Sequence, residues 1–224
     1  MTTPRVTPQQ AWDEFIAGNE RFISGSSNHP NQDVERRSEL ADKQAPNVAL
    51  FGCSDSRLAA EIIFDCGLGD LFIARNMGHV VAESITASME YAVQYLGSAL
   101  IVVLAHDSCG AVAAAVDQSG REPSPVTKSV ANTLAPILPS VQQFWLKDHH
   151  ETPYVDAAEV DANAIGRLHL ARTVNQLLRA SRTISDAVDR GELAVVGCQY
   201  RLAEGRAVPY IAVGPLQIAL ADPA

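Results

Sequence analysis

Apolar residues along the chain follow two alternating patterns. Short continuous apolar runs, rich in β-branched side chains, predict buried strands. Between them, apolar residues recur every three or four positions, which is the spacing of one helix face. The continuous runs predict strands at 48–51, 71–74, 100–104 and 193–198, with a last strand around 210–213.

The periodic stretches predict helices before and between these strands. The first begins at Thr7, which can cap it, and Pro8 suits the first helical position. Gln10 completes a capping box with Thr7. Further helices are predicted at 60–64, 84–96, 110–116, 126–145 (interrupted near two prolines), 161–180 and 183–190.

Continuous apolar strands that alternate with helices are typical of a parallel sheet covered on both faces. We therefore expect an α/β fold, with a mainly parallel sheet of about four strands plus a final edge strand, flanked by helices. The 224 residues contain no obvious linker, which favours a single domain over 1–224. Within it, 1–44 would form an N-terminal helical arm and connection, and 45–224 the α/β core. The arm could pack on its own domain or on a neighbouring subunit.

Composition and charge narrow the class of protein. Hydrophobic residues make up 47% and charged residues 19%, which fits a folded chain. The net charge of −9, with no basic cluster, argues against nucleic acid or an anionic membrane as partner. The first ten residues lack the apolar stretch of a signal peptide, and no apolar run is long enough to span a bilayer. We expect a cytoplasmic location.

The four cysteines change the picture, because thiols in a cytoplasmic protein are more often free or metal-binding than paired in disulfides. Cys66 and Cys198 are interpreted as small buried hydrophobes. The other two belong to short motifs that closely follow the first and third predicted strands. In open parallel sheets, ligands bind beyond the carboxyl ends of strands, so the motifs should meet if those strands are neighbours. The motifs are Cys53-Ser54-Asp55-Ser56-Arg57 and His106-Asp107-Ser108-Cys109.

Taken singly, each of these residues is more often an ordinary buried side chain. Together, Cys53, His106 and Cys109 offer two thiolates and an imidazole, a three-ligand set for tetrahedral zinc with its fourth position open. Two thiolates make such a zinc a weaker acid than three histidines would. Asp55 could therefore accept a hydrogen bond from a zinc-bound oxygen, while Arg57 keeps Asp55 ionised and oriented. Without Arg57, Asp55 could itself become the fourth ligand in a closed, inactive state.

The two motifs, with Gly110 after the second, resemble the zinc signature of β-class carbonic anhydrases, and the resemblance extends over roughly 15–213. It implies reversible hydration of carbon dioxide to bicarbonate and a proton. One Zn²⁺ per subunit would be bound by the two cysteines and the histidine, and Asp55 and Arg57 would orient a zinc-bound hydroxide. The resemblance also implies a homodimer or homotetramer with active sites at the subunit interface. The residues it implies for the carbon dioxide pocket are Gln44, Phe72, Tyr91 and the backbone amide of Gly110.

Two other functions stay open at this point. The same zinc site could hydrolyse a related heteroallene such as carbon disulfide, and a non-catalytic zinc-bound subunit is a further reading. An intact Asp55, Arg57 and Gln44 argue against the second, since a site without activity does not need them. For Phe72 and Tyr91 the alternative role is ordinary core packing.

Overall fold

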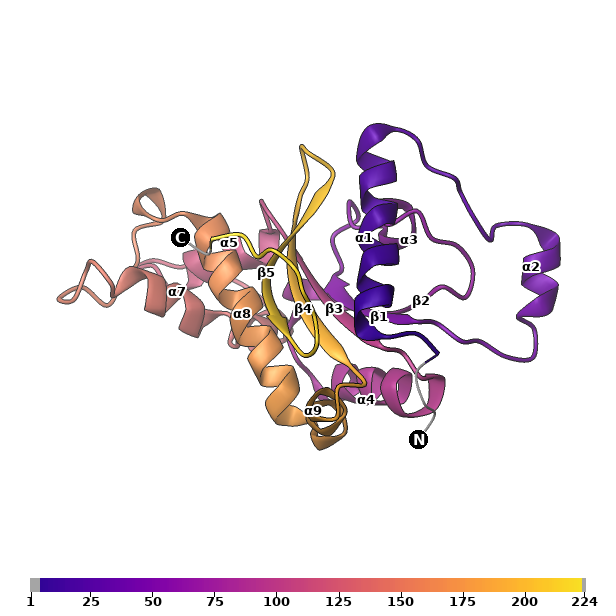
Figure 1. Ribbon diagram of the computed structural model, residues 1–224. Coiled ribbons are helices and arrows are strands. Elements are labelled where there is room, and N and C mark those ends of the chain that lie inside the picture. The colour runs from indigo at the N-terminus through magenta and orange to yellow at the C-terminus, as the bar shows by residue number, and fades with distance from the viewer. Residues whose placement is uncertain (1–4, 223–224) are drawn as a thin grey trace.

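The computed structural model describes residues 5–222. Its centre is a five-stranded sheet in the order β2-β1-β3-β4-β5 (Figure 1). The pairs β1–β2, β1–β3 and β3–β4 are parallel, whereas β5 runs antiparallel to β4. The predicted α/β fold, with a mainly parallel sheet and a final edge strand, is confirmed. The strands are β1 (Val48–Cys53), β2 (Leu71–Asn76), β3 (Leu100–His106), β4 (Ala194–Arg201) and β5 (Arg206–Val213).

The central strands and the edge strands differ in burial. Every residue of β1 and β3 is buried, because helices cover both faces of the sheet. Alternate residues of β1 enter two separate apolar clusters: Leu50 lies in one and Phe51 in the other. In contrast, β2 is half-buried over most of its length, and so is β5. The edges of the sheet are therefore the surfaces with apolar area left to cover.

Each face of the sheet has its own helices. One cluster takes its buried helical residues from α4 (Glu83–Tyr91), α8 (Ala162–Ala180) and α9 (Arg182–Asp189). On the other face pack α1 (Pro8–Ser24), α3 (Ala60–Ile63), α5 (Gly110–Gln118), α6 (Lys128–Leu134) and α7 (Leu138–Trp145). The predicted helical stretch 126–145 is thus two helices, broken near its prolines as expected. No helix within residues 5–222 combines the length and apolarity needed to cross a bilayer.

Helix α1 lies against its own subunit. The capping box predicted at its start is present. Phe15 stacks on Phe64 with ring centroids 3.7 Å apart. The buried amide of Asn19 donates to the backbone carbonyls of Ile63 and Gly205. Within this chain, α1 therefore packs on its own domain, and packing on a neighbouring subunit stays a prediction.

Two segments differ from the sequence-based expectation. Helix α2 (Val34–Glu39) was not predicted, because none of its residues is buried and no apolar stripe marks it; it stands away from the sheet (Figure 1). The predicted helix 84–96 changes its hydrogen bonding near its end. There α4 passes into a single π-helical turn (Ala92–Leu96) before Gly97, which has the left-handed φ of 72°.

Candidate metal centre

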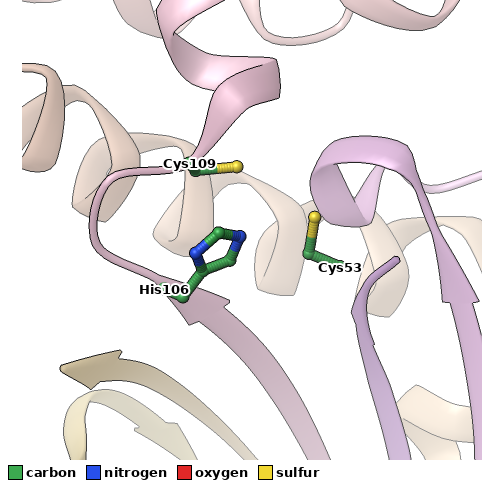
Figure 2. A group of neighbouring side chains, drawn as sticks. All are labelled: Cys53, His106 and Cys109. Atoms are coloured by element: carbon green, nitrogen blue, oxygen red, sulfur yellow. The ribbon is translucent and has the colours of Figure 1, made fainter. Parts of the chain in front are cut away.

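The two cysteine motifs meet at the carboxyl edge of the sheet. Because β1 and β3 are paired neighbours, Cys53 at the end of β1 and His106 at the end of β3 lie at the same edge. A short turn then brings Cys109 to the start of α5. Figure 2 shows the three side chains converging on a common centre. The expected meeting of the motifs is confirmed.

The geometry of this group suits a metal ion. The two sulfurs and a His106 ring nitrogen lie within 4.8 Å of one another, and all three residues are buried. His106 Nδ1 lies 2.8 Å from the carbonyl oxygen of Asp107. A carbonyl only accepts, so Nδ1 carries the proton and Nε2 a lone pair. That Nε2 is buried without a hydrogen-bond partner among the described residues, as expected of a nitrogen that binds a metal.

The two thiols of the group lie close enough to affect each other's protonation. The neighbouring Cys109 and His106 side chains lower the pKa of Cys53 although burial opposes the shift. The neighbouring Cys53 and burial both raise the pKa of Cys109. Without a metal, the first proton is therefore lost from Cys53 more readily than from Cys109. Binding of a metal by both sulfurs requires both protons to leave, because thiolates are the ligands.

Asp55 and Arg57 form a bidentate ion pair beside the ligand group. Arg57 Nε donates to Asp55 Oδ1 and Nη2 donates to Oδ2, each at 2.8 Å, and the Arg57 backbone N–H adds a third bond of 3.0 Å. These bonds hold the pKa of Asp55 well below its usual range, although burial opposes the shift. Asp55 Oδ2 lies 3.8 Å from His106 Nε2. The carboxylate is thus ionised, turned toward Arg57, and at the margin of the ligand group.

Two arginines connect the elements around the group. Arg57 Nη2 reaches across to the carbonyl oxygen of Ser108, at 3.3 Å, and so joins the two motifs. From β2, Arg75 Nε donates to the Cys53 carbonyl oxygen at 2.8 Å, and its Nη2 donates to the Asp55 carbonyl. Both contacts fix backbone next to a ligand, which limits how far the group can shift.

Gly110 is the one predicted pocket residue beside the ligand group within this chain. It is the first residue of α5 and directly follows Cys109. A Cβ built on Gly110 would meet no atom within 4 Å, so open space adjoins its backbone. The N-terminal N–H groups of a helix attract negative charge. A small anion can therefore approach the ligand group from this side.

Gln44, Phe72 and Tyr91 lie elsewhere in the chain. Gln44 precedes β1, and this strand alone extends about 17 Å from Val48 to Cys53 at 3.3 Å per residue. Phe72 pairs with a residue four positions before Cys53, about 13 Å away along the strand. The rings of Phe72 and Tyr91 are 6.0 Å apart, and Tyr91 shares a hollow of about 630 Å³ with Gln44. The three gather with one another and not with the ligands of their own chain.

The surroundings of these three residues are open to solvent and mix apolar side chains with the charged side chains of Arg37, Asp42 and Lys43. Tyr91 is 46% exposed and stacks on Tyr95, which is 60% exposed, at 5.2 Å; Leu68 is 46% exposed. Core packing therefore does not explain Tyr91, and half-buried Phe72 lies beside it on the edge strand. Large apolar side chains that gather on a surface mark an interaction site. We call Leu68, Phe72, Tyr91 and Tyr95 the aromatic patch.

Of the remaining cysteines, Cys198 is buried as predicted, whereas Cys66 is less buried than predicted. Cys198 is fully buried and Cys66 is half-buried against the core, and both are free thiols outside the ligand group. Burial raises the pKa of Cys66 to about 12 and that of Cys198 further. Sequence reasoning missed Gly78, whose N–H donates to Cys53 Sγ at 3.4 Å. A glycine just after a strand was its only signal.

Comparison with known proteins agrees with this arrangement. Residues 48–207 match the family model described as carbonic anhydrase. The chain is 42% identical over 207 residues to carbonic anhydrase 2 of Mycobacterium tuberculosis, covering 92% of this chain and 94% of the relative. It is 40% identical over 205 residues to the carbonic anhydrase of Mycolicibacterium smegmatis, covering 91% and 93%.

Solved structures show the same fold. A tetrameric β-carbonic anhydrase from Sordaria macrospora superposes with a TM-score of 0.68 at 22% identity, over 92% of this chain and all of that one. The β-carbonic anhydrase CafA of Aspergillus fumigatus gives 0.67 at 25% identity, over 91% and 92%. The sequence matches, the shared fold and the convergent ligand group lead to one conclusion. The chain belongs to the β-carbonic anhydrase family.

Proposed function

We propose that this chain is a zinc-dependent carbonic anhydrase that interconverts carbon dioxide and bicarbonate. The observation that carries the proposal is the convergence of Cys53, Cys109 and the unpartnered Nε2 of His106. Two sulfurs and one imidazole are a donor set that suits zinc, and three protein ligands leave a position for chemistry. When bound, zinc supplies a Lewis acid that makes water nucleophilic near neutral pH.

In this proposal Asp55 orients the attacking water. Its carboxylate is ionised and lies 3.8 Å from the ligand nitrogen of His106, within reach of an atom seated between the ligands. It accepts a hydrogen bond from the water and so directs the oxygen lone pair toward the substrate carbon. Arg57 holds both carboxylate oxygens and keeps Asp55 from turning into the ligand group.

In this proposal the first turn of α5 stabilises the negative charge of the bicarbonate product. Bicarbonate is an anion, and negative charge develops on the substrate oxygens as it forms. The backbone N–H of Gly110 adjoins open space at a helix N-terminus, so it can donate to one of these oxygens. The donor therefore lies on a side of the ligand group where glycine leaves room for the substrate.

Completing the pocket requires a second subunit in this proposal. Gln44, Phe72 and Tyr91 lie too far from the ligands of their own chain. Phe72 and Tyr91 belong to the aromatic patch at a half-buried strand edge, and Gln44 shares a hollow with Tyr91. Placed on the site of a neighbour, Phe72 and Tyr91 give an apolar wall for carbon dioxide and Gln44 a polar anchor. The relative from Sordaria macrospora is described as a tetramer. We propose a homodimer or a pair of dimers here.

The test is stopped-flow hydration of carbon dioxide by the zinc-loaded protein, followed with a pH indicator. The proposal expects zinc-dependent activity that a chelator removes and added zinc restores. A folded, zinc-loaded oligomer inactive from pH 7 to 9 would contradict it and favour a non-catalytic subunit. Release of hydrogen sulfide from carbon disulfide, without carbon dioxide hydration, would instead favour the heteroallene hydrolase.

A further inference from the structure

Two histidines are buried behind the ligand group. His79, in the turn after β2, is 1% exposed, and His169, on α8, is fully buried. Their ring centroids are 4.6 Å apart. Among the described residues, three of their four ring nitrogens have no hydrogen-bond partner. The fourth, His169 Nε2, lies 2.8 Å from the carbonyl oxygen of Gly78. Buried polar groups are normally paired, so two buried rings that make only one such hydrogen bond among the described residues are unusual.

The bond to Gly78 fixes the protonation of His169. A carbonyl oxygen only accepts, so Nε2 carries the hydrogen. Burial lowers the pKa of His169, which keeps the imidazole neutral. Its other nitrogen, Nδ1, is unpartnered among the described residues. His169 is therefore a neutral donor with one tautomer and one described acceptor.

The backbone of Gly78 connects α8 to the ligand group through two hydrogen bonds. While its carbonyl accepts from His169, its N–H donates to Cys53 Sγ at 3.4 Å. Gly78 has a left-handed φ of 72°, and a Cβ there would lie 2.8 Å from Ile137 Cδ1 and 3.0 Å from Ala111 Cβ. Only glycine fits this place without strain. This left-handed conformation directs the Gly78 N–H toward the sulfur of Cys53, a candidate metal ligand.

Helix α8 holds this turn at a second point. His79 also has a positive φ, of 42°, so two successive residues are left-handed. Thr173 Oγ1 donates to the His79 carbonyl oxygen at 3.5 Å. His169 and Thr173 are four residues apart on α8 and therefore share one face. One helix face thus binds two successive carbonyls of a strained turn, and the shorter bond is that of His169.

We propose that His169 is a positioning residue of the metal centre, which keeps the Gly78 N–H on the sulfur of Cys53. An N–H donor reduces the negative charge that a thiolate gives to a metal. That matters most at a site with two thiolates, where the metal is otherwise a weak acid. Groups behind the direct ligands tune a bound metal in this way. The inference rests on the proposed zinc site.

The test compares His169→Leu, which removes the donor, with His169→Gln, whose amide nitrogen reaches about as far as Nε2. Zinc affinity is measured by competition with a chromophoric chelator. The sulfur-to-metal charge-transfer band is measured in the cobalt-substituted protein. We expect His169→Leu to bind zinc about 10- to 100-fold more weakly, because the turn that holds the sulfur of Cys53 in position is no longer fixed to α8. Its band should move to longer wavelength, because the sulfur holds its electrons less tightly. His169→Gln should stay near the wild type in both readouts.

A control separates positioning from loss of core packing. Val174, also on α8, is fully buried in the apolar cluster on its face of the sheet. Val174→Ala should lower the melting temperature while zinc affinity and the cobalt band stay unchanged. If His169→Leu does not fold, His169→Asn replaces it, because its shorter amide cannot reach Gly78.

Three results decide the inference. An unchanged affinity and band in the donor-free variant would overturn it. So would equal changes in His169→Gln and His169→Leu, because the donor would then be irrelevant. Failure of the wild type to bind zinc would instead overturn the proposed function. Thus the two proposals fail by different measurements.

Discussion

The two ends of the central sheet are built differently. At the carboxyl end, Cys53, His106 and Cys109 are buried and already converge within one chain. At the amino end, Gln44 and Tyr91 are exposed beside a half-buried strand edge. The difference teaches that one chain brings a group able to hold a metal ion together by itself, whereas in our proposal the substrate pocket needs side chains from a neighbour.

Strand position explains the contrast. The ligands follow the two central strands, which are buried on both faces and flanked by further strands. The Arg75 side chain donates to the Cys53 carbonyl oxygen and the Gly78 backbone N–H donates to Cys53 Sγ, so both hold the first ligand in place. Phe72 lies on β2, the edge strand, and Leu68, Tyr91 and Tyr95 of the aromatic patch beside it are exposed. The ligand group and the aromatic patch thus lie at opposite ends of the sheet, the first after β1 and β3 and the second beside β2.

Loss of a ligand should have the largest effect, and it should act at the carboxyl end alone. We expect Cys53→Ser to lose zinc and to reduce carbon dioxide hydration to the uncatalysed background, because two ligands hold zinc poorly. Cys66→Ser is the matched control, since Cys66 is a half-buried thiol outside the group. Zinc content and stopped-flow rates check both variants. Full zinc in Cys53→Ser would contradict the assigned ligand set.

Removing Arg57 should release Asp55 toward the metal. We expect Arg57→Ala to lower activity by about 10- to 100-fold while zinc stays bound, because the freed carboxylate takes the fourth position. The cobalt-substituted variant should then no longer change its spectrum when thiocyanate is added. Arg57→Lys, which keeps the charge but not the bidentate contact, should fall between. A variant whose metal still exchanges its fourth ligand at low pH would rule out this closed state.

Gly78 tests the backbone support of the ligand end. Gly78→Ala should lower the free energy of unfolding by about 1–2 kcal/mol for the left-handed backbone, plus the effect of the close contacts. It should also weaken zinc binding. Gly191→Ala is a matched control, since Gly191 has the same φ of 72° with no atom within 4 Å of its Cβ position. Denaturant unfolding and chelator competition measure both. Equal losses in the two variants would show that the contacts around Gly78 do not matter.

The Asp55–Arg57 pair should give the smallest effect, a pH dependence of stability. The folded-state pKa of Asp55 is lowered, so its contribution is complete above the unfolded pKa of about 3.9 and is lost as pH falls below it. The stability difference between wild type and Asp55→Asn should therefore be constant from pH 5 to 8 and shrink below pH 4. Urea unfolding with a chelator present measures it. A stability difference that grows as the pH falls would contradict the lowered folded-state pKa of Asp55.

Much of this contrast was readable in the sequence. Continuous apolar runs predicted β1 and β3, and the residues directly after them predicted the ligand group, because strand-end placement follows from chain order. The bond between His169 and Gly78 was not predictable, since it joins residues 91 positions apart through a backbone carbonyl. Helix α2 lacked an apolar stripe. The separation of Gln44 from Cys53 follows from the strand between them, yet a resemblance alone grouped them in one pocket.

The most direct test of the division between the two ends is complementation. Cys53→Ser removes a ligand and leaves the aromatic patch, whereas Gln44→Ala combined with Tyr91→Ala removes pocket residues and leaves the ligands. Each homo-oligomer should be nearly inactive. In a dimer of one chain of each kind, one of the two sites regains intact ligands and an intact neighbouring pocket, so we predict about half of wild-type activity per mixed dimer. Activity no greater than the sum of the two separate variants would contradict a pocket shared between subunits.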